Sequence, residues 1–203
     1  MKFSVVIIFI FTILNSCTEK FEKLSSSQSD TDELLKKIEP NKDVQYWQLE
    51  RIPNWKDESK NSEILFKEGR NNSNETIPIF ENDWNGFFTG CQPVYCAYRI
   101  TFLENNVWKV AKTKEDLKKF IGEIDNENEA FLIGQINDYS LDYYSAKGNG
   151  YLKEKDGYKI KMMIYNSCPE TKESFTLFIT KEGKIQKVKN NGFYLKSKNC
   201  IKY

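Results

Sequence analysis

The sequence predicts an α+β domain, mostly antiparallel β-sheet, with a helix pair near residues 113–139 and a C-terminal β-meander. Two observations carry this prediction. Runs rich in aromatic and β-branched residues alternate with short turn sequences over much of the chain. One stretch in the middle shows helix start signals and helical spacing of apolar residues instead. Residues 31–203 have the length of a single domain.

The first expected element is a short helix over residues 32–38. Asp30 stands at its cap position, its acids come first and its lysines last, as the helix dipole favours, and Pro40 ends it. After it, residues 44–80 are expected to form short extended pieces broken by Pro53 and Gly69.

A β-hairpin is expected next. Segments 95–102 and 107–111 are rich in aromatic and β-branched residues, and Glu104-Asn105-Asn106 lies between them. Such a composition suits strands.

The helix pair follows. Thr113-Lys114-Glu115-Asp116 matches a capping box, and Gly122 suits the end of the helix. The apolar residues between them recur at helical spacing and predict a core-facing stripe: Leu117, Phe120, Ile121 and Ile124. Asp125 is expected to begin the second helix, with an apolar face made of Leu132, Ile133, Ile136 and Tyr139. The run 130–133 also suits a strand, and this alternative stays open.

The C-terminal third predicts two hairpins. Residues 151–154 and 158–165 flank Lys155-Asp156-Gly157, a strong turn signal. Residues 174–180 and 184–195 flank Lys181-Glu182-Gly183. Apolar and polar residues alternate there, which indicates a sheet with one buried and one wetter face.

The first 17 residues predict an export segment. Lys2 precedes an apolar run from Phe3 to Leu14, interrupted by Ser4 and Thr12. This run is shorter than the roughly 20 residues that a membrane-spanning helix needs. Leu14-Asn15-Ser16-Cys17, which ends the segment, resembles the lipobox of bacterial lipoproteins.

The resemblance implies cleavage between Ser16 and Cys17, a diacylglycerol on the Cys17 sulfur and an acylated amino terminus, with palmitate as a typical chain. It implies a lipid bilayer as partner and a place in the cell envelope, at the outer membrane, with the domain facing the periplasm or the surface. An ordinary signal peptide containing a cysteine is the alternative. The expected organisation is a signal peptide (1–16), a lipidated cysteine with a flexible serine-rich tether (17–30) and one globular domain (31–203).

Four cysteines remain once Cys17 is assigned to lipid, and an even number in an exported protein suggests two disulfides. Three connectivities are possible. We favour Cys168–Cys200, because the last hairpin brings these residues together, and Cys91–Cys96 as a loop staple. A redox or metal site at Cys91–Cys96 is the alternative, but its spacing is not Cys-x-x-Cys.

Charge and composition exclude several function classes. Without residues 1–16 the chain has 29 basic and 29 acidic residues, which argues against nucleic-acid binding. The absence of histidine removes Ser-His-Asp and Cys-His catalysis and the common zinc sites. No nucleotide or dinucleotide fingerprint occurs, so no cofactor is expected.

Residues 81–86 carry oxygen ligands at EF-hand spacing, but Glu81 stands first and Gln92 would replace the bidentate acid. An Asn85-Gly86 turn is the favoured interpretation, and no metal is expected. The acids of residues 125–129 are better explained as helix caps.

Most of the numerous aromatic residues are expected in the core, with Trp84 the best candidate for a binding surface. These observations favour a non-enzymatic envelope lipoprotein that binds a ligand, glycan or protein partner, for example an immunity-type protein. One alternative is a carboxylate-dependent hydrolase of envelope glycans or peptides. Another is a structural envelope component.

Overall fold

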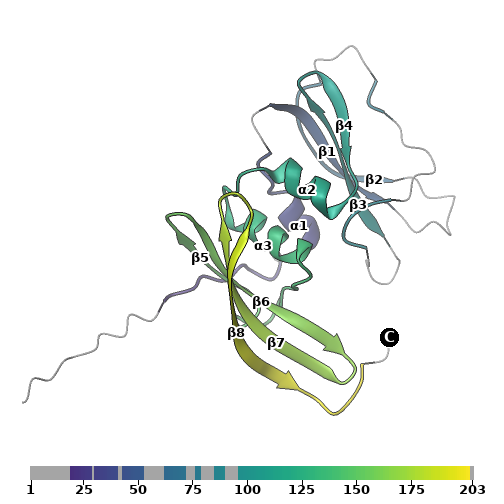
Figure 1. Cartoon of the computed structure of the whole chain (residues 1–203). Coiled ribbons are helices and arrows are strands. Elements are labelled where there is room, and N and C mark those ends of the chain that lie inside the picture. The colour runs from purple at the N-terminus through teal and green to yellow at the C-terminus, as the bar shows by residue number, and fades with distance from the viewer. Residues whose placement is uncertain are drawn as a thin grey trace, which may run out of the picture.

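In the part of the chain that the structure describes, two four-stranded antiparallel sheets have three helices between them (Figure 1). The computed structural model describes residues 19–28, 30–40, 43–52, 62–71, 76–78, 85–89 and 96–201. The predicted α+β class, dominated by antiparallel sheet, is confirmed. No helix among these residues is long and apolar enough to cross a membrane.

Sheet 1 has the order β2-β1-β3-β4. Its strands are β1 (Val44–Ile52), β2 (Glu63–Gly69), β3 (Ala97–Glu104) and β4 (Val107–Ala111). The predicted β3–β4 hairpin is confirmed, and its turn residues Asn105 and Asn106 both have positive φ, 52° and 60°. Asparagine adopts this left-handed backbone more readily than most residues, which explains the turn.

Three short helices lie between the sheets: α1 (Thr31–Leu35), α2 (Lys114–Ile121) and α3 (Glu127–Ile136). Asp30 caps α1, and Thr113 with Asp116 forms the predicted capping box of α2. A second capping box, Asn126 with Glu129, starts α3 one residue later than predicted. The alternative strand over residues 130–133 is therefore wrong.

Sheet 2 is a meander in chain order, β5-β6-β7-β8. Its strands are β5 (Gly150–Glu154), β6 (Gly157–Ser167), β7 (Glu170–Thr180) and β8 (Ile185–Lys196). Both predicted hairpins are confirmed. Cys168, in the β6–β7 turn, and Cys200, after β8, form the predicted disulfide with Cα atoms 4.2 Å apart. Cys96 is also disulfide-bonded, but its predicted partner Cys91 lies outside the described residues.

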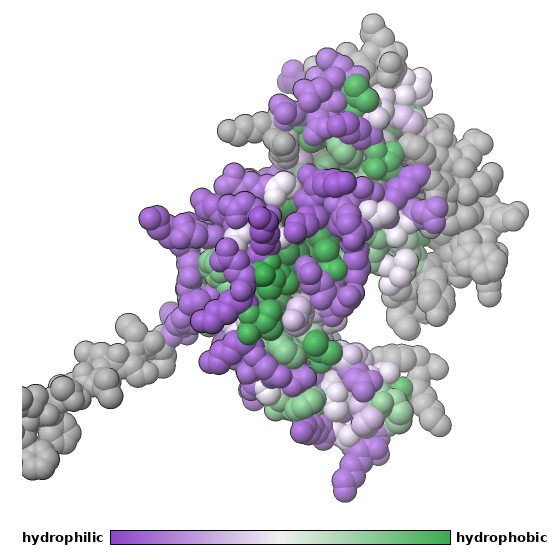
Figure 2. Space-filling model, viewed as in Figure 1, coloured by the Kyte–Doolittle hydropathy of each residue, from purple (hydrophilic) through white to green (hydrophobic). Residues whose placement is uncertain are grey.

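One hydrophobic core joins the two sheets through the helices. Phe120 of α2 packs on Trp47 of β1 and Phe102 of β3, with ring centroids 5.5 and 4.9 Å apart. On the other side α3 approaches sheet 2 closely at Gly134, where an added Cβ would lie 2.0 Å from the Met162 sulfur. On the face viewed in Figure 2, hydrophobic side chains gather over the central helices and hydrophilic ones surround them.

The outer face of sheet 1 holds a buried polar network. Arg99 lies opposite Glu50 in the β1–β3 ladder, and its Nε donates to Glu50 Oε2 at 3.1 Å. Gln48 and Thr101 donate to the other oxygen of Glu50, at 2.7 and 3.2 Å. Glu50 and Arg99 are only 4% and 3% exposed, so this ion pair is shielded from water.

The flexible tether predicted over residues 17–30 includes residues that the structure fixes against sheet 2. Glu22 and Tyr151 exchange two backbone hydrogen bonds of 2.8 Å, and Leu24 is buried. Asn149 also donates to the Leu24 carbonyl at 3.2 Å. The apolar residues Phe21 and Leu24, set among polar neighbours, supply the contacts that fix this segment to sheet 2.

Candidate functional site

A polar cavity of about 1220 Å³ lies where sheet 1 meets the helices. Its wall comes from the start of α1, the end of β1, the start of β3, the segment that joins β4 to the start of α2, and the C-terminal end of α3 with the segment after it. It also includes residues 85–89. Among the described lining residues, those with polar or aromatic side chains suited to contact a ligand include Asp32, Arg51, Tyr98, Gln135, Tyr139 and Tyr143.

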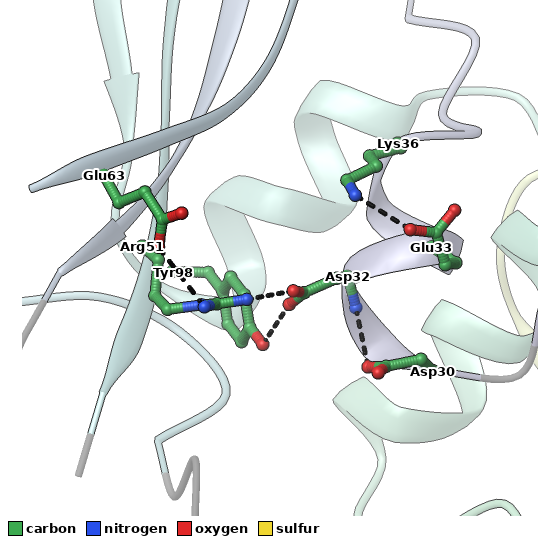
Figure 3. Close-up of polar contacts among 7 residues, drawn as sticks. All are labelled: Asp30, Asp32, Glu33, Lys36, Arg51, Glu63 and Tyr98. Carbon is green, nitrogen blue, oxygen red and sulfur yellow. Dashed lines mark hydrogen bonds and ion pairs between the residues drawn. The ribbon is translucent and has the colours of Figure 1, made fainter. Parts of the chain in front are cut away.

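Asp32 is the centre of a charged cluster in this wall (Figure 3). The Tyr98 hydroxyl donates to Asp32 Oδ1 at 2.5 Å, and Arg51 Nη2 forms an ion pair with Oδ2. Arg51 Nη1 reaches Glu63 Oε2 at 3.3 Å. The position of Asp32 is set by the helix cap. The Asp30 side chain accepts a hydrogen bond from the Asp32 N–H at 3.2 Å, which starts α1 at this point.

Burial and the Asp32 carboxylate raise the pKa of Tyr98 well above its usual range. Burial, with the charges of Asp30 and Asp32, also raises the pKa of Tyr143. Both hydroxyls therefore keep their protons at neutral pH. Neither can act as a base. The Tyr98 proton is donated to Asp32, and the Tyr143 hydroxyl remains a donor for a ligand.

Two buried polar atoms in this wall make no hydrogen bond within the described part of the chain. They are Arg51 Nε, a donor, and Gln135 Oε1, an acceptor. The amide of Gln135 is held from its other end, where Nε2 donates to Thr31 Oγ1 at 3.2 Å. Since buried polar groups in proteins are nearly always paired, these two atoms are suited to a polar ligand.

Aromatic side chains stand beside these polar groups. Tyr139 packs edge-on against Phe175 of β7, with ring centroids 5.5 Å apart. Tyr143 and Phe88 also line the cavity. Aromatic faces next to fixed donors and acceptors are the usual composition of a site for sugars and other polar organic molecules.

The acids of the cavity are Asp30, Asp32 and Asp138. Asp32 is occupied on both oxygens, and the exposed Asp138 forms an ion pair with Lys114. No group of three Cys, Asp or Glu side chains suited to a metal ion occurs among the residues that the structure describes.

The sequence did not single out this cavity. In the sequence Asp32 stands out only as an acid in the first turn of a short helix, and Arg51 and Tyr98 carry no signal of their own. Asn85 and Gly86, for which the sequence predicts a turn, line the cavity, whereas Trp84, Cys17 and Ser16 lie outside the described residues. The confirmed Cys168–Cys200 disulfide is not part of the cavity.

Comparison with family models, curated proteins and solved structures finds no match to the chain.

Proposed function

We propose that the chain is a lipid-anchored protein of a bacterial cell envelope that binds a polar ligand, most simply a short glycan, without catalysis. The observation that carries the binding role is the pair of unpaired polar atoms, Arg51 Nε and Gln135 Oε1, beside aromatic side chains in one cavity. The lipobox-like sequence Leu14-Asn15-Ser16-Cys17 supports the anchor.

The ligand site can be tested with two variants. Arg51→Lys keeps a cation for Asp32 but removes the Nε donor, and Gln135→Leu removes the free acceptor. We expect each variant to weaken binding about tenfold, the effect of one hydrogen bond of about 1.4 kcal/mol. The measurement is titration calorimetry with the oligosaccharides that the wild-type protein captures on an array of soluble glycans.

Gln186→Leu, an exposed glutamine of β8, is the matched control and should bind like the wild type. Capture of no glycan by the wild-type protein would refute the glycan assignment. Equal affinities for Arg51→Lys, Gln135→Leu and the control would refute the cavity as its site.

The anchor has a separate test. Cys17→Ala should abolish incorporation of labelled palmitate and leave the protein unprocessed or released from the membrane, because several acyl chains on one residue give a firm anchor. The variant Cys168→Ala/Cys200→Ala should keep its label, although it lacks two other cysteines. Labelling of Cys17→Ala at the wild-type level would contradict the proposal.

A hydrolase is the second candidate, because Asp30, Asp32 and Asp138 line one cavity. Glycoside hydrolysis requires one carboxyl as acid and a second as base or nucleophile. Asp32 is engaged by Arg51 and Tyr98, which favours a positioning role. The test is whether the protein releases reducing sugar from cell-wall glycan. Release by the wild type that is absent from both Asp32→Asn and Asp138→Asn would establish the enzyme instead.

A further inference from the structure

Four neighbouring lysines lie on the outer face of sheet 2, the face turned away from the helices, where Lys172 further along β7 pairs with Asp142. The strand register places them in two cross-strand rows, Lys159–Phe178–Lys187 and Lys161–Thr176–Lys189. The opposite face of β6 and β7 carries the buried Ile160, Leu177 and Ile179. We refer to Lys159, Lys161, Lys187 and Lys189 as the lysine face.

The charge of the chain is divided sharply between its two parts. Residues 150–203, which contain sheet 2, hold 12 lysines and five acids, a net charge of +7. Residues 17–149 hold 17 basic and 24 acidic residues, a net charge of −7. The neutral total therefore conceals a basic sheet, and such a sheet attracts an anionic surface.

The chain reaches the lysine face directly after Cys17. Glu19 forms an ion pair with Lys159 at 2.5 Å, and Lys161 Nζ lies 4.0 Å from the ring centroid of Phe21. The backbone then joins the edge of β5 through Glu22 (Figure 1). Lys187 and Lys189 are exposed and form no ion pair within the described residues.

We propose that the lysine face lies against the anionic phospholipid headgroups of the membrane that holds the anchor. This inference rests on lipidation of Cys17 in the proposed function. Cys17 stands two positions before Glu19, so the lipidated residue lies within about 7 Å of the Glu19 backbone. The anchor therefore holds the lysine face near the membrane surface. Charges interact there over a screening length of about 8 Å at physiological salt, which brings the exposed Lys187 and Lys189 under the influence of the headgroups.

Anionic lipid is the partner that this geometry favours. The anchor holds a membrane beside the lysine face at all times, whereas any soluble anion must compete with it. Each lysine close to an anionic surface increases the affinity for it about fivefold. None of the described residues that line the ligand cavity belongs to β5–β8, so docking through this face leaves the cavity accessible.

Lysine labelling of the full processed lipoprotein tests the orientation. The protein is reconstituted into vesicles of phosphatidylcholine alone or mixed with phosphatidylglycerol, treated with an amine-reactive reagent and analysed residue by residue by mass spectrometry. Labelling of Lys187 and Lys189 should be at least about fivefold slower on the anionic vesicles, and high salt should remove the difference. Lys67, on β2 of the other sheet, is the internal control and should be labelled equally on both.

A charge-reversal pair completes the experiment. Lys187→Glu/Lys189→Glu should remove the protection of Lys161 on anionic vesicles, whereas Lys67→Glu/Arg70→Glu should retain it. Equal labelling of the lysine face on both kinds of vesicle would overturn the proposal. The mass of the N-terminal peptide from the same sample reports lipidation, so a missing anchor is distinguished from a wrong orientation.

Discussion

Arg99→Met is expected to lower the free energy of unfolding by about 3–5 kcal/mol. The substitution leaves the Glu50 carboxylate buried and without its cation on the outer face of sheet 1, where Glu50 is only 4% exposed. A buried charge without a partner is among the most costly defects of a folded protein. Denaturation in urea, followed by circular dichroism, measures the loss.

Two further variants separate the charge from the packing. Glu50→Gln/Arg99→Met should recover most of the lost stability, because neither charge remains while the amide oxygen still accepts from Gln48 and Thr101. Arg70→Met, at an exposed position after β2, should change stability by no more than about 0.5 kcal/mol. A loss for Arg99→Met as small as that for Arg70→Met would contradict the expected role of the ion pair.

The second large effect concerns Glu129 of α3, whose side chain is fully buried. Its carboxylate accepts from the backbone N–H groups of Glu39, Asp125 and Asn126, at 2.8, 2.7 and 3.3 Å. Burial raises the pKa of Glu129 to about 7, although these three donors act in the opposite direction.

Because folding raises the pKa of Glu129, the free energy of unfolding depends on pH in this range. Between about pH 4.5 and pH 7 the folded protein retains a proton on Glu129 that the unfolded chain has released. The free energy of unfolding therefore falls as the pH rises through this window, by up to about 3 kcal/mol from this one group. Below the window the contribution is fully present, and above it the loss is complete.

Glu129→Gln tests this prediction because glutamine also serves as the third residue of a capping box. Its stability should change less between pH 4.5 and pH 8 than that of the wild type, as measured by the urea midpoint at each pH. Glu127→Gln, at the first position of the same helix, should keep the wild-type profile. Identical profiles for Glu129→Gln and the wild type would show that the carboxyl does not titrate in this range.

Local signals were sufficient for much of the fold. Three predicted features depend on residues close in sequence. They are the Thr113–Asp116 capping box, the Asn105-Asn106 turn and the turn before Gly157. The strand run at 130–133 was ambiguous because four apolar residues suit either structure. This segment is helical because Asn126 and Glu129 cap its N-terminus and because Gly134 lets it pack closely on sheet 2.

The cavity depends on long-range contacts that no local signal contains. Asp32 meets Arg51 across 19 positions and Tyr98 across 66. These contacts exist because β1 pairs with β3, which places Arg51 opposite Tyr98, and because Asp32 of α1 points toward both (Figure 3). The basic sheet, by contrast, is already visible in the sequence, as a difference in net charge between residues 17–149 and 150–203.

The Cys168–Cys200 disulfide lies at the end of sheet 2 that projects beyond the helices. There the face that is buried elsewhere is open, with Ile164 44% and Phe193 47% exposed. Strand ends without core contacts tend to fray, and β8 is an edge strand whose backbone could pair with another chain. The disulfide links the segment after β8 to the β6–β7 turn at this end. We therefore expect this covalent bond, and not core packing, to prevent β8 from pairing with a neighbouring molecule.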